Sequence, residues 1–224
     1  GGFEDWRLPT MKELYSLMNF RGNDPTSDDV SNIQPFINTD YFDFAYGDLD
    51  AGARIIDAQY WSANVYVDKV FGHQDAAFGL NLADGRIKGY PISGPVGNGR
   101  YVYYCRGNTA YGINDFKDNG DKTITDHATG LMWAKEDCGE QDGNGPRSGM
   151  KWEDALAWVQ QMNSEKYLGY SDWRMPNAKE MQSILDYLRS PSTTDSPAMD
   201  PIFNATEIEN EKGESDYPWY WTST

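Results

Sequence analysis

The sequence predicts a loop-rich α+β protein made of two tandem copies of one unit. The first observation is a repeat, because residues 172–185 are similar to residues 5–18 and align with them without a gap. The second is composition: 22 glycines and 11 prolines among 224 residues favour turns over a helical bundle. The third is a set of short aromatic or alternating runs that are typical of strands. A repeat of this length indicates two copies of one structural unit.

Each copy of the repeat reads as an extended segment that enters a capped helix. A proline keeps the residue before it out of helical conformation. Thr10 and Asn177 follow, each with a glutamate three residues on, which is the spacing of a capping box. We expect the tryptophan of each copy to be buried alike and the arginine to satisfy local carbonyls or a carboxylate. The residues of this repeat motif are Trp6, Arg7, Pro9, Glu13, Trp173, Arg174, Pro176 and Glu180.

The similarity continues beyond the helix. Residues 33–38 resemble residues 199–204, since both place a proline and an asparagine at the same spacing. Residues 58–64 resemble residues 218–224, where aromatic side chains precede small, often hydroxyl-bearing residues. Both of these last segments are predicted to begin strands.

The first unit is predicted to span residues 1–108, with its N-terminal part missing. Strands are expected at residues 76–82 and 86–90, joined by an Asp-Gly hairpin turn. Residues 101–107 are expected to close the sheet. This unit therefore holds short antiparallel strands after its capped helix.

The second unit is predicted to span residues 112–224, with its C-terminal part missing. It opens with a turn and strand over residues 116–126, and residues 129–134 are the expected hairpin partner. Apolar residues between 152 and 162 recur at spacings of three and four, which predicts an amphipathic helix. The capped helix is expected over residues 177–189, so a complete unit carries two helices.

Charge and hydropathy exclude two classes of partner. The net charge of −16 and the isoelectric point near 4.4 repel phosphate backbones and anionic lipids. We therefore expect no nucleic acid as a partner, and the same field disfavours a polyanionic glycan. No apolar run approaches the roughly 20 residues of a membrane span. Membrane insertion is not expected.

The order of the motifs carries a family resemblance. The second unit contributes residues 118–126, 129–133, 152–156, 172–181 and 220–223, and the first contributes residues 6–9, 60–62, 78–80, 84–90 and 105–107. Together they resemble the bacterial Lcl C-terminal domain family, a domain of unknown function, in two tandem copies. This family is similar to the formylglycine-generating-enzyme group, which implies C-type-lectin-like units.

The resemblance also implies a compartment and a type of function. Members are typically exported bacterial proteins, in the periplasm, on the cell surface or secreted. The founding example is an adhesin domain that binds sulfated polysaccharides, and the family has no accepted catalytic motif. We therefore expect a non-enzymatic recognition and adhesion protein that binds a glycan or a cell-surface partner through its long loops. The alternatives are a structural subunit that binds only protein and a formylglycine-generating-type oxidase.

The two cysteines bear on the oxidase alternative. Cys105 and Cys138 lie in different units, so a reactive pair of the oxidase type is not expected. In an exported protein, a disulfide between them is the more economical interpretation.

Candidate ligand-binding residues are aromatic, because such rings stack on sugars. About half of any strand cluster is expected to be core by alternation. The candidates are Tyr41, Tyr46, Tyr101, Tyr217, Trp219 and Tyr220.

One acidic turn is a weak calcium candidate, and no other cofactor is expected. Asp118, Asn119, Asp121 and Asp126 place oxygen ligands around Gly120, as calcium loops do. The bidentate glutamate of such loops is absent, because Thr129 stands at its position. The favoured alternative is a turn whose side chains bond their own backbone.

Overall fold

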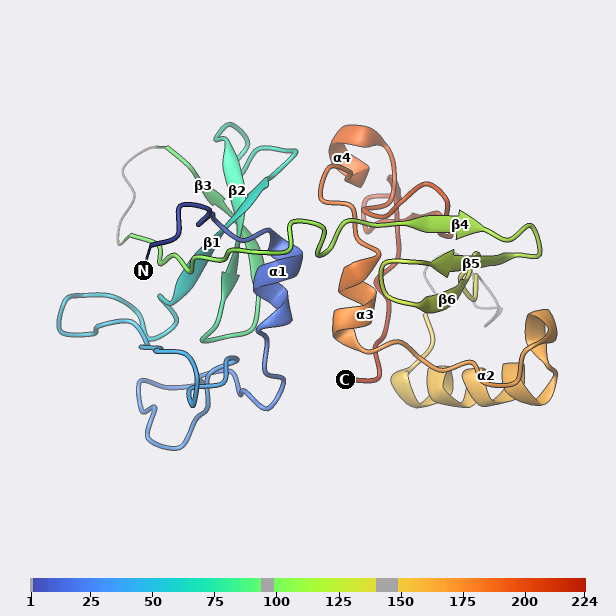
Figure 1. The fold of residues 1–224 in the computed structure, drawn as a ribbon, viewed down its shortest axis with the longest axis horizontal. Coiled ribbons are helices and arrows are strands. Elements are labelled where there is room, and N and C mark those ends of the chain that lie inside the picture. Colours follow the sequence, from blue (N-terminus) through green and yellow to red (C-terminus); the bar gives the residue numbers. More distant parts are fainter. Residues whose placement is uncertain (1, 94–98, 140–148) are drawn as a thin grey trace. The chain divides into compact units, whose positions relative to one another are not determined.

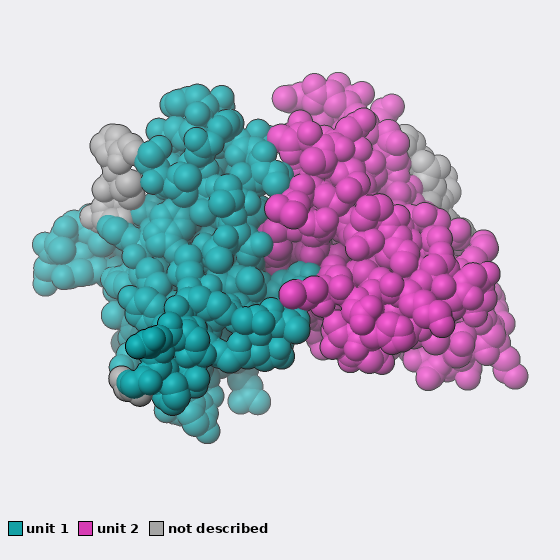
Figure 2. Space-filling view, turned by 45° about the horizontal axis from the view of Figure 1, so that its top comes forward, with its two compact units in different colours: residues 1–112 teal, residues 113–224 magenta. Residues whose placement is uncertain are grey.

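The computed structural model describes residues 2–93, 99–139 and 149–224. The chain divides into two compact units, residues 1–112 and 113–224, which Figure 2 colours separately. Both units combine helical and antiparallel sheet structure with long irregular connections (Figure 1), which confirms the loop-rich α+β class. Within the described residues, no helix has both the length and the apolar character needed to cross a membrane.

Unit 1 is one short helix packed on one sheet. The helix α1 spans Met11–Ser16, and the strands are β1 (Gln59–Val65), β2 (Ala76–Asn81) and β3 (Ile87–Pro91). They pair antiparallel in the order β1-β2-β3. The predicted Asp-Gly turn joins β2 to β3, with Gly85 at φ +73, a conformation that favours glycine. The core lies between α1 and the sheet and includes Met11, Leu14, Ile37, Leu80 and Leu82.

Unit 2 has a separate sheet and core. The strands β4 (Phe116–Asp118), β5 (Thr123–Asp126) and β6 (Leu131–Ala134) pair antiparallel in chain order. The helices are α2 (Trp152–Ser164), α3 (Ala178–Ser183) and α4 (Pro191–Thr194), with a 3-10 turn at Tyr167–Gly169. A small hairpin of β7 (Ile208–Glu209) and β8 (Ser215–Asp216) follows. The core consists of Ile124, Ile184, Met199 and Phe203, with Phe116, Trp133 and Met181 packed against it.

The capped helix recurs in both units, as the repeat predicts. The side chain of Thr10 accepts the amide of Glu13 at 3.2 Å, and the Glu13 carboxylate accepts the Thr10 amide at 2.8 Å. Asn177 and Glu180 make the same reciprocal bonds at 2.9 and 2.8 Å. The capping boxes are therefore confirmed in both copies.

Two details of the predicted repeat are wrong. Trp6 is 52% exposed, whereas Trp173 is half-buried against Tyr167 and Tyr170, two residues that follow α2. The tryptophans are thus not buried alike, because the described residues of unit 1 include no counterpart of α2. The helix expected over residues 177–189 ends at Ser183, since Leu185 leaves it to bridge Met199.

The similarity after the helix has a different register from the predicted one. Met18 bridges Ile37 in unit 1 just as Leu185 bridges Met199 in unit 2. The next residue, Asn38 or Asp200, then accepts the amide two positions on in both units. Residues 37–42, rather than residues 33–38, are therefore the counterpart of residues 199–204.

A backbone hydrogen bond between the proline before each helix and the aromatic segment also recurs in both units. The carbonyl of Pro9 accepts the amide of Ala63 at 2.8 Å, and that of Pro176 accepts the amide of Ser223 at 2.9 Å. These bonds make residues 219–224 the counterpart of residues 59–64. Only the first segment becomes a strand, because β2 pairs with it, so the strand predicted at residues 218–224 is not formed.

The closing segment of unit 1 is less regular than predicted. Residues 101–107 form no named strand, and two isolated bridges hold them instead. Tyr101 bridges Tyr60 in parallel, and Cys105 bridges Arg7 in antiparallel fashion. The segment therefore joins β1 to the extended segment that precedes α1.

Candidate functional site

An aromatic stack in unit 1 connects the closing segment to the long loop of residues 19–57. The rings of Tyr60 and Tyr103 are parallel, with centroids 4.6 Å apart, and Tyr101 lies 5.4 Å from Tyr60 on a tilted plane. Phe42 of the loop meets the Tyr103 ring edge-on at 5.8 Å. We call Phe42, Tyr60, Tyr101 and Tyr103 the tyrosine ladder.

Backbone bonds fix the ladder in place. The amide of Tyr101 donates to the Gln59 carbonyl at 2.8 Å, and the Trp61 amide donates to the Tyr101 carbonyl at 3.0 Å. The hydroxyl of Tyr103 donates to the carbonyl of Asp43 at 2.8 Å. Tyr60 is only 5% exposed, whereas Tyr101 is 46% exposed. The ladder therefore presents the Tyr101 ring to solvent on a base formed by the buried Tyr60 and the half-buried Phe42 and Tyr103.

The Tyr103 hydroxyl of the ladder lies close to a charged residue of the loop. Burial, and then the negative charge of Asp43, raise the pKa of Tyr103. Burial also raises the pKa of Tyr60, so both hydroxyls keep their protons at neutral pH. Asp40 and Asp43 are exposed. The ladder thus combines an exposed aromatic ring, that of Tyr101, with one charged residue, Asp43, beside Tyr103.

The predicted binding residues of unit 1 separate into three environments. Tyr101 belongs to the ladder. Tyr41 follows Asp40, ahead of Phe42, and is 82% exposed. Tyr46 instead packs edge-on against Phe44, with its hydroxyl buried. The structure therefore brings Tyr101 into a built site and places Tyr46 in a packing role.

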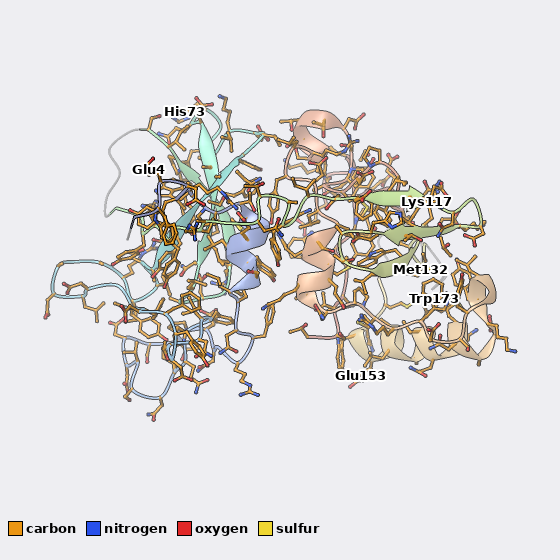
Figure 3. All side chains as sticks on the ribbon, viewed as in Figure 1. Glu4, His73, Lys117, Met132, Glu153 and Trp173 are labelled. Atoms are coloured by element: carbon orange, nitrogen blue, oxygen red, sulfur yellow. The ribbon has the colours of Figure 1, made fainter. Side chains whose placement is uncertain are left out.

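Unit 2 contains two adjoining hollows. One, of about 330 Å³, is lined by β6 and by the extended segment before α3; Met132 and Trp173, labelled in Figure 3, both border it. The other, of about 260 Å³, has mainly apolar walls. The two share Trp133, Trp173, Arg174 and Pro176 as a common wall.

A hydrogen-bonded carboxylate stands at the edge of the second hollow. Asp137 accepts the Tyr220 hydroxyl at 2.7 Å and the Thr206 hydroxyl at 2.5 Å. Burial opposes the ionisation of Asp137, but these bonds outweigh it and lower its pKa. Tyr220 is thus placed at a hollow, while Trp219 is 99% exposed and Tyr217 is half-buried beside β8.

Both units match one known protein family. Residues 1–104 and residues 122–224 each match the family model of the Lcl C-terminal domain. The chain belongs to this family. It carries two tandem copies, as the sequence predicts. No curated protein and no solved structure matches the chain.

In these Lcl C-terminal repeats the structure records no disulfide at Cys105 or Cys138. The predicted Cys105–Cys138 bond would join the two units, and it stays a prediction. Cys105 is instead held by its own unit, with its sulfur 3.8 Å from the Arg7 carbonyl and from the Glu13 carboxylate. Burial and the charge of Glu13 raise the pKa of the Cys105 thiol. The thiolate, which is the reactive form, is therefore disfavoured.

In the acidic turn of the second repeat, the side chains make hydrogen bonds to residues close to them in the sequence. Asp118 accepts the Gly120 amide, and Asp121 accepts the amide and hydroxyl of Thr123. Asp126 is buried and accepts the Ala128 amide and the Thr129 hydroxyl. Asn119 donates to Thr123 and Thr125. The described residues hold no group of three or more acidic, histidine or cysteine side chains placed to bind a metal.

Sequence reasoning missed the buried and half-buried residues that support both sites. Tyr60 and Tyr103 are adjacent to the candidate Tyr101 in space, and only the alternation of Tyr101 with Tyr103 signals this in the sequence. Trp133 and Trp173 form the wall between the hollows of the second repeat. The repeat motif did single out Trp173, but as a core residue.

Proposed function

We propose that the chain is an exported bacterial recognition and adhesion protein, without catalytic activity, that binds a neutral glycan at the tyrosine ladder. The observation that carries this proposal is the half-exposed ring of Tyr101 on a buried aromatic base. Tyrosine is enriched at binding surfaces, because its ring is apolar while its hydroxyl can make hydrogen bonds. The exported location follows from the family resemblance.

The ladder suits a sugar because it needs little ordering on binding. A sugar ring offers C–H groups to an aromatic face and hydroxyls to nearby acceptors. Tyr101 supplies the face, and the exposed side chain of Asp43, whose backbone carbonyl accepts the Tyr103 hydroxyl, supplies an acceptor. Because stacking and backbone bonds already fix the ring, the entropy lost on binding is small.

Charge selects the class of glycan. The chain carries a net charge of −16, and the loop next to the ladder is rich in aspartate. A sulfated or uronic glycan would be repelled at moderate ionic strength. The ligand is therefore a neutral oligosaccharide.

The thiol environment supports the absence of oxidase chemistry. The raised pKa of Cys105 keeps its thiol protonated, and the Arg7–Glu13 pair beside it serves the helix cap. An oxidase of the formylglycine-generating type would need a reactive cysteine pair. Substrate turnover that is lost on substitution of Cys105 or Cys138 would contradict the non-enzymatic assignment.

A glycan array tests the proposal directly. The full chain is expected to bind a subset of neutral oligosaccharides and no sulfated ones. Tyr101→Ala should lose these signals, since its backbone bonds remain but its ring is gone. Tyr111→Ala is the matched control, because Tyr111 is also exposed but lies outside the ladder. Binding of sulfated glycans alone, or equal signals from both variants, would refute the proposal.

Recognition of protein alone is the second candidate function, and the open hollows of the second repeat favour it. The walls of the hollow of about 260 Å³ are mainly apolar, unlike the polar surroundings of the ladder. A partner captured at these hollows, together with an empty glycan array, would favour this candidate.

A further inference from the structure

We infer that the acidic turn between β4 and β5 guards a covalent modification site, because it holds the Asn119-Gly120 pair in a conformation that blocks deamidation. An asparagine followed by glycine deamidates readily, since glycine has no side chain to hinder attack by its amide nitrogen. The pair begins directly after Asp118, the last residue of β4 (Figure 1). The inference concerns the chemical lifetime of the chain and does not depend on the proposed glycan.

Deamidation needs two groups to meet. The Gly120 nitrogen loses its proton and bonds to the side-chain carbon Cγ of Asn119, and the bond from Cγ to Nδ2 breaks. The departing nitrogen takes up a proton and leaves as ammonia. Water then opens the five-membered imide to aspartate or isoaspartate. The reaction therefore requires a deprotonated Gly120 amide and an Asn119 side chain that turns toward it.

Burial does not protect the pair, because Asn119 and Gly120 are both exposed to solvent. The turn also requires its glycine. Gly120 has φ +79, which lies in the left-handed region that favours glycine. An Asn-Gly pair is thus kept where water reaches it, and its protection has to come from conformation.

The attacking nitrogen is engaged by Asp118. The Gly120 amide donates to Oδ1 of this residue at 2.9 Å, and the Lys135 ammonium donates to Oδ2 at 2.6 Å. The bond from Lys135, and then that from Gly120, lower the pKa of Asp118, so the carboxylate is ionised at neutral pH. A negative charge on the acceptor opposes loss of the Gly120 amide proton.

The Asn119 side chain is bound by β5. Its Nδ2 group donates to the hydroxyl oxygens of Thr123 and Thr125, both at 2.9 Å. The backbone amide of Asn119 donates to the Thr123 carbonyl at 3.0 Å. Neighbouring side chains along an extended segment point to opposite faces, so the carboxamide lies away from the Asp118 side chain that the Gly120 amide reaches. The Asn119 Cγ is therefore turned away from its attacker.

Asp121 fixes which atom of the amide faces Thr123. The Thr123 hydroxyl donates to the Asp121 carboxylate at 2.6 Å, because an ionised carboxylate only accepts. The Thr123 oxygen therefore accepts from Asn119, which presents Nδ2 to it. Thr123 is fully buried, so water does not compete for this bond. The two aspartates have separate roles, since Asp118 binds the attacking amide and Asp121 orients the leaving group.

Deamidation should then proceed only when the hairpin opens. A reaction that requires opening is slowed by the equilibrium constant for opening, and about 1.4 kcal/mol of opening free energy gives about a tenfold reduction. The product would lose both amide donors and place a third carboxylate between Asp118 and Asp121. Isoaspartate would also lengthen the backbone of the turn. A single opening that leads to reaction would therefore leave a permanent mark.

Peptide mapping by mass spectrometry tests the inference on the full chain. The chain is kept in mildly alkaline buffer, either folded or unfolded in urea, and conversion at Asn119 is followed with time. The folded chain should react at least about tenfold more slowly at this residue. The Asn-Gly pairs at residues 98–99 and 144–145 calibrate the urea sample, in which all three pairs should react at similar rates.

Substitutions separate the clamp on Asn119 from general stability. Thr123→Val combined with Thr125→Val removes both acceptors of Nδ2 and should speed up deamidation of the folded chain at least about threefold. Serine at both positions keeps the hydroxyls and should preserve the wild-type rate. The matched control is Thr129→Val, which removes a hydroxyl bonded to Asp126 but leaves the contacts of Asn119 intact. Its rate should be unchanged.

Equal rates for Asn119 in the folded and the urea-unfolded chain would overturn the inference. So would a double valine variant that unfolds in urea like the wild type and deamidates at the wild-type rate. If that variant no longer unfolds cooperatively, Asp118→Ala takes its place, because it releases the Gly120 amide without touching either threonine. A wild-type rate in the folded Asp118→Ala chain would equally contradict the protection.

Discussion

Arg174 donates to both carboxylate oxygens of Glu180, each at 2.6 Å, while Glu180 also accepts the amide of the helix-capping residue Asn177. Arg7 and Glu13 repeat the arrangement in the first unit, at 2.6 and 2.5 Å. One glutamate thus ties the extended segment to the start of the helix. This explains why the arginine and the glutamate occur together in both copies of the motif.

The first prediction concerns pH. Hydrogen bonds from Arg7 and Arg174 lower the pKa of Glu13 and Glu180 below the ordinary value of 4.5. The two ion pairs therefore stabilise the fold above about pH 4.5, and this contribution is lost as the pH falls through the lower, folded pKa. Urea unfolding from pH 7 to pH 3 should show this loss. Glu13→Gln with Glu180→Gln should flatten the profile, and an unchanged slope would contradict the assignment.

The second prediction concerns the helix caps. Thr10→Ala or Asn177→Ala should each lower the free energy of unfolding of its own unit by about 1 kcal/mol, through loss of the N-cap bond. Chemical denaturation measures this change. Thr109→Ala, in an exposed turn, is the control. Unchanged stability of both cap variants would count against the capping boxes.

The third prediction concerns the cysteines. Titration of the unreduced protein with a thiol reagent should give two thiols, because the structure records no disulfide at either cysteine. Cys138 is exposed, whereas burial raises the pKa of Cys105, so Cys138 should react first. Cys138→Ser should remove the fast phase. If the titration detects no thiol, the result would instead support the Cys105–Cys138 disulfide that the sequence predicts.

The fourth prediction concerns the acidic turn. Millimolar calcium should leave the melting temperature unchanged, because the oxygens of Asp118 and Asp121 already accept bonds within the turn. Asp121→Ala should lower the melting temperature without calcium, since it removes the bonds to Thr123. Asp28→Ala, in the other unit, serves as the control. A calcium-induced rise that Asp121→Ala abolishes would show a metal site instead.

The sequence could predict the features that depend on neighbouring residues. The capping boxes needed only Thr10 and Glu13, or Asn177 and Glu180, three positions apart. The register after the helix was missed, because residues 33–38 imitate the proline and asparagine spacing of residues 199–204. The true register depends on the bridges of Met18 and Leu185, which join segments far apart in the chain.

The candidate sites were predictable only in part, for the same reason. The sequence predicted Tyr41 and Tyr101 as aromatic candidates beside acidic loops. The tyrosine ladder, however, depends on the nonlocal bridge between Tyr60 and Tyr101 and on the stacking of Tyr60 with Tyr103. The different burial of Trp6 and Trp173 depends on the segment after α2, which accompanies only the second tryptophan. A repeated motif therefore predicts the local structure that both copies share, but not which other segments pack against it.

The central claim is that Tyr101 presents a sugar-binding face on a rigid aromatic base. The most direct measurement is calorimetric titration of the full chain with a neutral oligosaccharide identified on the array. We predict that Tyr101→Phe retains most of the affinity, that Tyr101→Ala loses at least about tenfold, equivalent to about 1.4 kcal/mol, and that Tyr111→Ala binds like the wild type. Equal affinities of Tyr101→Ala and the wild-type chain would contradict the account.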